Sequence, residues 1–359
     1  MTDLDQRIAS VLRERAEGEI DTRRLLRVSR AQGRRRQLRR RAATGTALTL
    51  AGILGLVGVT GTDFTGLPGR LPWIATTPTV APPVPPRADG VPGAAQRPDL
   101  VGGDPRVLHL GLDTSRARYL GWNIYGWTQT ESIRFSVGGG QPVVVEVSRS
   151  AQRLNDAAID GPGSQRITVP PLAFDGGVQP LGTTGGLAKG WQPVPGVYAR
   201  VTMLVGDRAA LERAVDVLRW DEARRCEAPL RLTTLPKDAT LTDCDVDVSA
   251  VPNGLRAQYT IGRGESAAMY VRLMYGAQIA GSRSDGNRTV DGRPAYLSPD
   301  GATLELLDIP KAHLVAAFGW LWPGIDPAKG YVSFTEADAT TVLAGAQVPK
   351  DLSDPETWD

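Results

Sequence analysis

The chain of 359 residues carries a formal net charge of +2, and 41% of its residues are hydrophobic, as in an ordinary globular protein. Single cores usually stop growing at about 250 to 300 residues, so this length allows more than one domain. The charge is uneven, because residues 1–41 hold thirteen arginines and six acidic residues, whereas residues 42–359 are mildly acidic. This distribution excludes a large nucleic-acid-binding surface after residue 41, and we predict no nucleic-acid partner.

Residues 1–41 form a short Arg-rich segment that we predict to be helical and cytoplasmic. Its first apolar residues have the i, i+4, i+7, i+8 spacing of an amphipathic helix, namely Leu4, Ile8, Val11 and Leu12. So short a segment cannot bury a core of its own, and its apolar stripe either rests on the membrane surface or docks a cytoplasmic regulatory protein. Residues 1–62 contain no His and no Cys, which excludes a zinc-binding domain there.

Residues 42–62 contain no charged side chain, and as a helix they would be about 31 Å long, enough to cross a bilayer. We therefore predict a transmembrane helix, with the lipid bilayer as a partner. Six arginines precede it: Arg34, Arg35, Arg36, Arg39, Arg40 and Arg41. By the positive-inside rule they place the N-terminus in the cytoplasm and the later chain outside the cell membrane. A cleaved signal peptide is the competing interpretation, but the preceding basic region is long and no A-x-A site follows closely.

Small residues recur at every fourth position of the predicted membrane helix, namely Ala43, Ala47, Ala51 and Gly55. Such a stripe lets two membrane helices approach closely, which makes a homodimer through this helix a hypothesis. A sequence so rich in Ala and Gly also produces these spacings by chance.

Residues 63–105 contain ten prolines, all between Pro68 and Pro105, and show no hydrophobic periodicity. A segment of this composition cannot form a core, since proline favours extended, unpaired backbone. We predict an extracytoplasmic stalk that separates the distal region from the bilayer.

Short β-branched and aromatic runs separated by Gly, Pro and Asn predict strands and hairpins after residue 105. Two helices interrupt them, one over residues 206–220 with Asp207 as its N-cap and a weaker one over residues 335–348. Each helix ends a comparable series of strands, so the expected fold class is α+β, with duplicated antiparallel sheets that are each covered by a helix. The predicted boundaries are residues 106–226 for the first unit, 227–350 for the second and 351–359 for an acidic tail.

The two cysteines of the chain are Cys226, after the first predicted helix, and Cys244, in the first strand of the second unit. In an oxidising compartment this pair predicts a disulfide, worth roughly 3 kcal/mol for a loop of this length. Such a bridge would clamp the junction between the units. Two buried free thiols are the alternative.

The sequence offers no recognisable catalytic or cofactor-binding motif. His109 and His313 each lie in an apolar, strand-like context, where a structural role is the better interpretation than metal binding. Asp243, Asp245 and Asp247 share one face of a strand and could bind calcium, but a solvated strand face suits them better. We therefore predict a protein that is not an enzyme and has no cofactor, with an envelope hydrolase as the less favoured alternative.

The order of segments resembles that of actinobacterial single-pass membrane proteins, mostly uncharacterised, some of them organised like anti-sigma factors. The shared features are the Arg-rich cytoplasmic helix, the Ala/Gly-rich membrane helix, the Pro-rich stalk and the β-rich outer region. The stretch "TVDGRPAYL", residues 289–297, looks like a hairpin that recurs in such outer domains. The resemblance implies sensing outside the membrane and signalling to a cytoplasmic regulator, but the His-and-Cys zinc motif of many anti-sigma domains is absent.

Together these features predict a membrane protein whose outer region senses or binds an envelope ligand. Signalling requires a specific cytoplasmic partner for residues 1–41. The alternative is a constitutive envelope scaffold or binding protein without signalling, for which the apolar stripe of the first helix would need no partner.

Overall fold

The computed structural model describes residues 81–358, except residue 158 and residues 161–165, 168–169, 182–184, 265–266, 277–278, 280–284 and 322–332. The chain divides into two compact units, residues 1–75 and 76–359, and every described residue belongs to the second. The predicted cytoplasmic segment and membrane helix therefore lie outside the described residues. None of the described helices has both the length and the apolar character that crossing a membrane requires.

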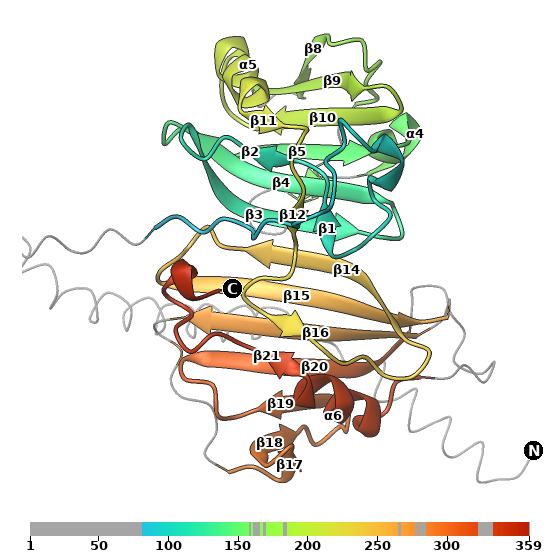
Figure 1. Ribbon diagram of the computed structural model, residues 1–359, viewed down its shortest axis with the longest axis vertical. Coiled ribbons are helices and arrows are strands. Elements are labelled where there is room, and N and C mark those ends of the chain that lie inside the picture. Colours follow the sequence, from blue (N-terminus) through green and yellow to red (C-terminus); the bar gives the residue numbers. More distant parts are fainter. Residues whose placement is uncertain are drawn as a thin grey trace, which may run out of the picture. The chain divides into compact units, whose positions relative to one another are not determined.

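The fold is built on one thirteen-stranded sheet in which every neighbouring pair of strands is antiparallel. Figure 1 shows β3 and β14 side by side in the middle of this sheet. The strands are, in spatial order, β17 (Arg288–Val290), β18 (Arg293–Leu297), β19 (Thr303–Leu306), β20 (Ala312–Leu321), β16 (Ala267–Gly276), β15 (Gly254–Arg263), β14 (Thr240–Asp247), β3 (Ala117–Tyr125), β4 (Thr130–Val137), β5 (Val143–Ser148), β10 (Val197–Met203), β9 (Gly186–Val194) and β8 (Val178–Leu181).

Shorter elements complete the fold. Four two-stranded ladders pair β1 (Val107–Leu108) with β12 (Arg224–Arg225), β2 (Gly111–Leu112) with β11 (Leu218–Arg219), β13 (Arg231–Leu232) with β21 (Ala346–Gln347), and β6 (Ile159–Asp160) with β7 (Arg166–Ile167). The described helices are α4 (Ala151–Asp156), α5 (Arg208–Asp216), α6 (Glu336–Ala344) and the 3-10 helices η1 (Pro98–Leu100) and η4 (Pro355–Thr357).

The predicted α+β class is wrong, because the fold is mostly β-sheet and the expected units share one sheet instead of forming separate sheet-and-helix layers. The two groups of strands join through the ladder of β3 with β14, which runs from Asp243 opposite Tyr125 to Asp247 opposite Gly121. This pairing satisfies backbone groups that would otherwise lie at two exposed sheet edges. The anchoring in a membrane that was part of the same prediction is not seen in the described residues.

The two halves of the sheet share a strand order over six strands, and the second half has one more strand, β17, at its edge. Outward from the centre, the first half runs β3, β4, β5, β10, β9 and β8, and the second runs β14, β15, β16, β20, β19, β18 and β17. In each half a helix of nine residues follows the fourth strand and leads into a two-residue strand, β11 or β21. The Asp113 N–H donates to the Val217 carbonyl at 2.8 Å, and the Thr233 N–H donates to the Gly345 carbonyl at 3.0 Å. The backbone pairing beside the two short strands β11 and β21 is therefore the same in both halves.

One face of the sheet, which we call the core face, carries the main hydrophobic core. Alternate residues of each strand point into it, as for Ile133 and Phe135 in β4 and Val145 and Val147 in β5, all 0% exposed. The cluster contains residues of α5, α6 and both halves of the sheet, so its burial of apolar side chains holds the halves together as one body.

Both predicted helices are present, and each begins at a side-chain cap. The Asp207 carboxylate accepts a hydrogen bond from the Ala210 N–H at 2.7 Å, as the sequence indicated. Thr335 and Asp338 form a capping box at the start of α6.

The predicted disulfide is confirmed. Cys226 and Cys244 are bonded, with their Cα atoms 6.3 Å apart and both side chains fully buried. The Trp122 indole N–H donates to the Cys226 carbonyl at 3.0 Å. The bridge therefore ties the chain between the two halves to the first strand of the second half.

The described end of the predicted stalk differs from an extended spacer. Residues 85–101, which we call the N-terminal strap, pack on the fold, and Ala88, Ala94 and Val101 are buried. Small side chains let the strap lie close to the backbone beneath it, and this contact replaces the water that a free stalk would have. The predicted acidic tail is also packed in part, since Leu352 and Trp358 are buried.

Candidate functional site

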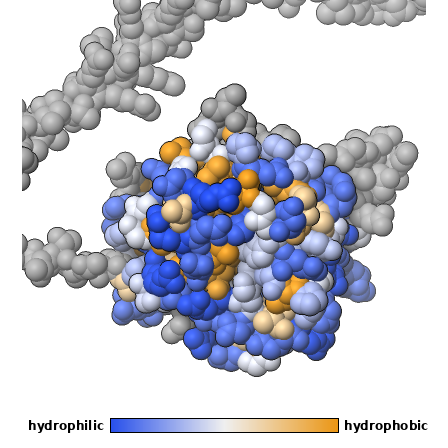
Figure 2. Space-filling model, turned by 90° about the horizontal axis from the view of Figure 1, so that it is seen from above, coloured by the Kyte–Doolittle hydropathy of each residue, from blue (hydrophilic) through white to orange (hydrophobic). Residues whose placement is uncertain are grey.

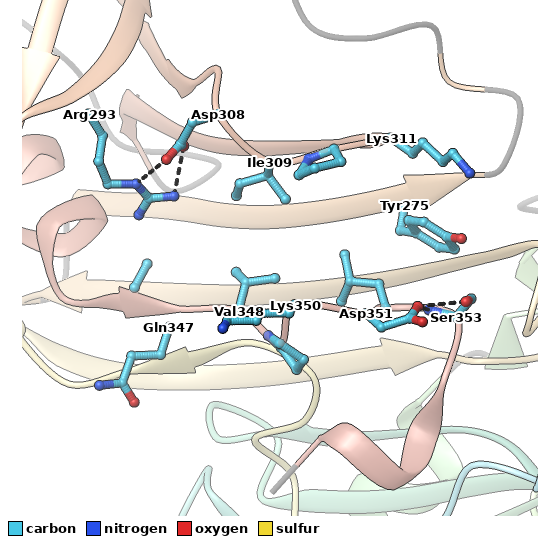
Figure 3. Close-up of a pocket in the computed structure, with 14 residues that line it drawn as sticks. Tyr275, Arg293, Asp308, Ile309, Lys311, Gln347, Val348, Lys350, Asp351 and Ser353 are labelled. Carbon is cyan, nitrogen blue, oxygen red and sulfur yellow. Dashed lines mark hydrogen bonds and ion pairs between the residues drawn. The ribbon is translucent and has the colours of Figure 1, made fainter.

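A groove of about 690 Å³ opens in the second half of the fold. Its walls come from three places: Tyr275 at the end of β16, residues 308–311 between β19 and β20, and the C-terminal segment 346–353. Arg293 of β18 closes one end. Figure 3 shows these side chains, with Arg293 and Asp308 at one end and Tyr275, Lys311, Asp351 and Ser353 toward the other.

Local backbone geometry positions the wall between β19 and β20. Lys311 has a φ of +56°, in the left-handed region that favours glycine, and its carbonyl accepts the Gly276 N–H at 3.1 Å. The Ala312 N–H donates to the Ile309 carbonyl at 3.3 Å. This tight turn buries Ile309 and leaves the Lys311 side chain exposed beside the groove.

The opposite wall is the chain after α6. It begins at β21, where Gln347 pairs with Arg231, and then runs through Val348 and Pro349 without further ladder pairing among the described residues. Buried Leu352 fixes the far end to the core. Proline in this stretch keeps the backbone extended and removes one N–H donor.

The two acidic side chains that line the groove, Asp308 and Asp351, already have partners. The Arg293 guanidinium donates two hydrogen bonds to Asp308, both 2.8 Å long. The Asp351 carboxylate accepts hydrogen bonds from the Ser353 hydroxyl at 2.6 Å and the Ser353 N–H at 2.8 Å. These bonds, with a smaller contribution from the charge of Lys311, lower the pKa of Asp351 and keep it ionised.

Lys311 and Lys350 remain available. In the part of the chain that the structure describes, neither ammonium group has a carboxylate within the 4.0 Å limit of an ion pair. The groove thus combines the apolar side chains of Ile309 and Val348 with two lysines and the ionised carboxylate of Asp351, on which the charge of Lys311 acts. This mixed lining suits binding of a segment that carries both apolar and polar groups.

The residues singled out in the sequence are distributed as follows. The two cysteines meet in the disulfide, far along the chain from the residues that line the groove. The proposed docking, membrane-orienting and helix-packing residues lie outside the described residues; they are Leu4, Ile8, Val11, Leu12, Arg34, Arg35, Arg36, Arg39, Arg40, Arg41, Ala43, Ala47, Ala51 and Gly55.

The two histidines are engaged in contacts with glutamates. His109 is buried, with Nδ1 2.7 Å from Oε1 of Glu131, which is 0% exposed. Glu131 also accepts the backbone N–H groups of Gly102 at 2.7 Å and His109 at 2.6 Å. This buried network fastens the chain that follows the strap to β4, a structural role. His313 pairs with Glu305, with Nδ1 and Oε1 2.5 Å apart.

The three aspartates of β14 each have a separate partner. Asp243 is buried and accepts the Gly126 N–H at 3.0 Å, and burial raises its pKa. Asp245 pairs with Arg256 at 3.1 Å, and Asp247 pairs with Arg134 at 2.8 Å. Within the described ranges no group of three or more metal-ligating side chains is found. The sequence suggested a solvated strand face for all three aspartates. Asp245 and Asp247 are partly exposed and fit this prediction, whereas Asp243 is buried.

Exposed apolar side chains are scattered. The large exposed hydrophobic residues of the described chain are Val84, Trp127 and Val205, which come from separate segments. Figure 2 shows small apolar areas separated by hydrophilic surface on the face seen from above. Single exposed hydrophobic residues are ordinary, so the groove is the stronger candidate for a binding site.

Sequence reasoning missed the groove, because its walls come from segments far apart in the chain. The stretch at residues 289–297 does form the expected hairpin, with Val290 opposite Arg293 across the Asp291–Gly292 turn. That hairpin places Arg293 at the end of the groove, but no sequence pattern links it to Lys350.

Fold and groove together define a mostly β protein, built on a single large antiparallel sheet with a basic groove beside its C-terminal segment. No protein-family model, curated protein or solved structure matches the chain. Function is therefore inferred from the groove and from the chemistry of the residues that line it.

Proposed function

We propose that this chain is a single-pass membrane protein whose outer region binds an envelope ligand in the groove without catalysing a reaction. The observation that carries the binding role is the groove itself, with Lys311 and Lys350 beside apolar surface. Support for the anchor comes from the uncharged stretch at residues 42–62 and the arginines before it.

Residues 1–41 supply the second part of the proposal, a cytoplasmic regulator that docks on the apolar stripe of the first helix. The resemblance to proteins organised like anti-sigma factors supports this part. Ligand binding outside would change what the stripe contacts inside, which requires the ligand to favour one of two states of the protein.

A topology assay tests the anchor. In intact cells that make the full chain with a tag at each end, added protease should remove the C-terminal tag and leave the N-terminal tag until the cells are opened. Loss of both tags, or of neither, from intact cells would contradict the proposed orientation.

Affinity purification from native membranes tests the regulator. The wild-type chain should capture a transcription regulator that an Ile8→Glu, Leu12→Glu variant loses, because two charges would interrupt the apolar stripe. Gln6→Glu with Ser10→Glu is the matched control, since it adds the same charge on the opposite helical face. Regulator-free eluates from all three would reject signalling.

A constitutive envelope-binding scaffold is the second candidate, and one observation favours it. The continuous sheet and the buried disulfide at the junction fix the two halves as one body, which leaves little room for a change of state between them. The scaffold would use the same groove but would need no cytoplasmic partner.

A further inference from the structure

Polar side chains at both ends of the groove flank an apolar middle. Figure 3 shows Arg293, Asp308 and Gln347 toward one end and Tyr275, Lys311 and Asp351 toward the other, with Ile309 between them. A ligand that fills the groove must therefore meet polar groups at each end and apolar surface in between.

The polar groups keep hydrogen-bonding capacity after their contacts with each other. Arg293 uses two of its N–H groups on Asp308, whereas a guanidinium carries about five. Both hydrogen bonds from Ser353 end on Oδ1 of Asp351, and an ionised carboxylate has about four acceptor sites. The exposed Gln347 amide both donates and accepts. Donors and acceptors therefore occur together, which suits a ligand rich in hydroxyl groups, because each hydroxyl also does both.

The shapes of these groups favour pairs of neighbouring hydroxyls. Guanidinium, amide and carboxylate groups are planar and present two polar atoms side by side, as in a bidentate hydrogen bond. The paired bonds with Asp308 fix the Arg293 group, and the bonds from Ser353 fix the Asp351 carboxylate. Groups that are already held in place lose little conformational entropy when a ligand binds.

Tyr275 supplies a flat apolar surface in the groove. It lies near the end of β16, where it packs against the main hydrophobic core and stays partly exposed. An aromatic face of this kind favours a flat ligand surface made of C–H groups, and its hydroxyl provides a polar tip. A sugar ring combines such a C–H face with hydroxyl groups around its edge.

Other ligand classes meet a specific penalty here. Each wall contains a proline, Pro310 on one side and Pro349 on the other, so a peptide added as a strand would lack a ladder hydrogen bond at either wall. The carboxylates of Asp308 and Asp351 oppose a polyanion. A wholly apolar ligand would remove the polar groups from water without giving them partners.

We propose that the groove binds a neutral oligosaccharide of the cell envelope. One sugar ring stacks on Tyr275, and hydroxyl groups bond to Asp351 at that end and to Arg293 and Gln347 at the other. The volume of about 690 Å³ is within the range of about 300 to 1,000 Å³ typical of ligand sites. This inference rests on the proposed function and names the ligand class for its groove.

Capture of radiolabelled envelope fragments tests the proposal. The fragments come from cells that make the chain, and the purified full chain is immobilised in a detergent without a sugar headgroup. One portion of the fragments is untreated, one is digested with protease, and one is oxidised with periodate, which cleaves the carbon–carbon bond between neighbouring hydroxyls. Capture should be the same for the first two portions and at least about tenfold lower for the third.

Variants assign the capture to the groove. Tyr275→Ala should lower it at least about tenfold, whereas Tyr275→Phe should keep it, because the ring face remains. Gln347→Ala should lower it about three- to tenfold through the loss of hydrogen bonds. Gln141→Ala, at an exposed glutamine between β4 and β5 in the first half, is the matched control and should leave capture unchanged. Gln347 is also exposed, so its variant should fold with an unchanged melting temperature.

Salt separates a neutral sugar from an acidic one. Raising the sodium chloride concentration from about 0.1 M to about 1 M shortens the Debye length from about 10 Å to about 3 Å. Capture of a neutral oligosaccharide should stay within about twofold, because this screening acts on charges. Loss of capture in high salt would instead assign the groove to an anion and overturn the proposal.

The treatments also separate failure of this proposal from failure of the proposed function. Capture that survives periodate, or that protease abolishes, would overturn the sugar as ligand but would leave a groove that binds another envelope component. Absence of capture, or capture that neither Tyr275→Ala nor Gln347→Ala reduces, would reject the groove as the binding site and the proposed function with it.

Discussion

The two halves of the sheet share a strand order but differ in what covers them. In the first half the N-terminal strap fills the core-side surface beside residues 220–225, and α4 covers the opposite, outer face. In the second half a groove opens beside the C-terminal segment, and Arg272 on the outer face is exposed. Coverage, more than strand order, therefore decides where such a sheet retains a binding surface.

The outer faces show the contrast most sharply at one cross-strand position. In the first half, Arg200 of β10 lies opposite Glu146 of β5, and both side chains are buried beneath α4. Arg200 also donates to the carbonyl groups of Leu154 and Ala157 at the end of α4. In the second half the matching strands place Arg272 opposite Val315. One arginine thus holds a covering helix, and the other contacts Gln258 in an exposed position.

Removal of Arg200 should have the largest effect. Arg200→Ala removes the ion pair with the buried Glu146 carboxylate and two hydrogen bonds to the end of α4, which should lower the free energy of unfolding by about 3 to 5 kcal/mol. Arg272→Ala, at an exposed arginine on the outer face of the other half, is the control and should stay within about 0.5 kcal/mol. Urea denaturation of the two variants measures the difference. Equal effects would mean that the outer faces are covered alike.

The disulfide should come next, because it sits where the halves join. Cys226→Ala with Cys244→Ala should reduce the free energy of unfolding by about 3 kcal/mol, since the bridge closes a loop in the unfolded chain. Reduced wild-type protein provides the control, because it loses the bridge while keeping both sulfur atoms. If the variant melts with unchanged stability, the core and the β3–β14 ladder alone hold the junction.

The strap can be tested within the chain itself. Gly93→Val should lower the free energy of unfolding by about 1 to 3 kcal/mol, because the new side chain meets backbone atoms of residues 220–222. Hydrogen exchange should then show faster exchange at the Ala95 amide, which donates to Trp220. Ala95→Val, at an exposed side chain of the same strap, is the control. Unchanged protection at Ala95 would contradict the close contact between the strap and residues 220–222.

The ion pairs that hold α5 and α6 to the sheet should give the smallest difference in stability between the two halves. In the second half Arg263 donates to Asp338 of α6 at 2.6 Å, and both side chains are 17% exposed. In the first half Lys189 pairs with Glu212 of α5, whose side chain is 42% exposed. Asp338→Asn should therefore cost about 1 kcal/mol at neutral pH, through the pair and the capping box. Glu212→Gln should cost less, because its pair is more solvated.

The Asp338 effect should also depend on pH. The hydrogen bond from Arg263, above all, lowers the pKa of Asp338 in the folded protein below the ordinary value of 3.8. A depressed folded pKa gives stability that is fully present above about pH 4 and is lost as the pH falls through the folded value. The difference between wild type and Asp338→Asn, followed by urea denaturation, should shrink in that acidic range. A difference that stays constant down to pH 2 would contradict the ion pair.

Much of the local structure followed from the sequence. Asp207 marked the start of α5 because a short carboxylate side chain caps exposed N–H groups, and the stretch at residues 289–297 indicated a hairpin through its resemblance to one that recurs in similar outer domains. The packed strap was missed, because a Pro-rich composition resembles a stalk until a partner surface is known. The groove was missed for the same reason, since Tyr275, Lys311 and Lys350 meet only in the folded chain.

By itself the sequence determined the elements that depend on neighbouring residues: the strand runs, the two helices with the Asp207 cap, the hairpin at residues 289–297 and the pair of cysteines. Only the tertiary structure decided that β3 pairs with β14, that the two predicted units share one sheet, and that the strap covers one half while the other keeps a groove. The physical reason is the separation, along the sequence, of the residues that make each contact. Caps and turns are set by contacts within a few residues, whereas sheet edges and grooves depend on which distant backbone segment satisfies the unpaired groups.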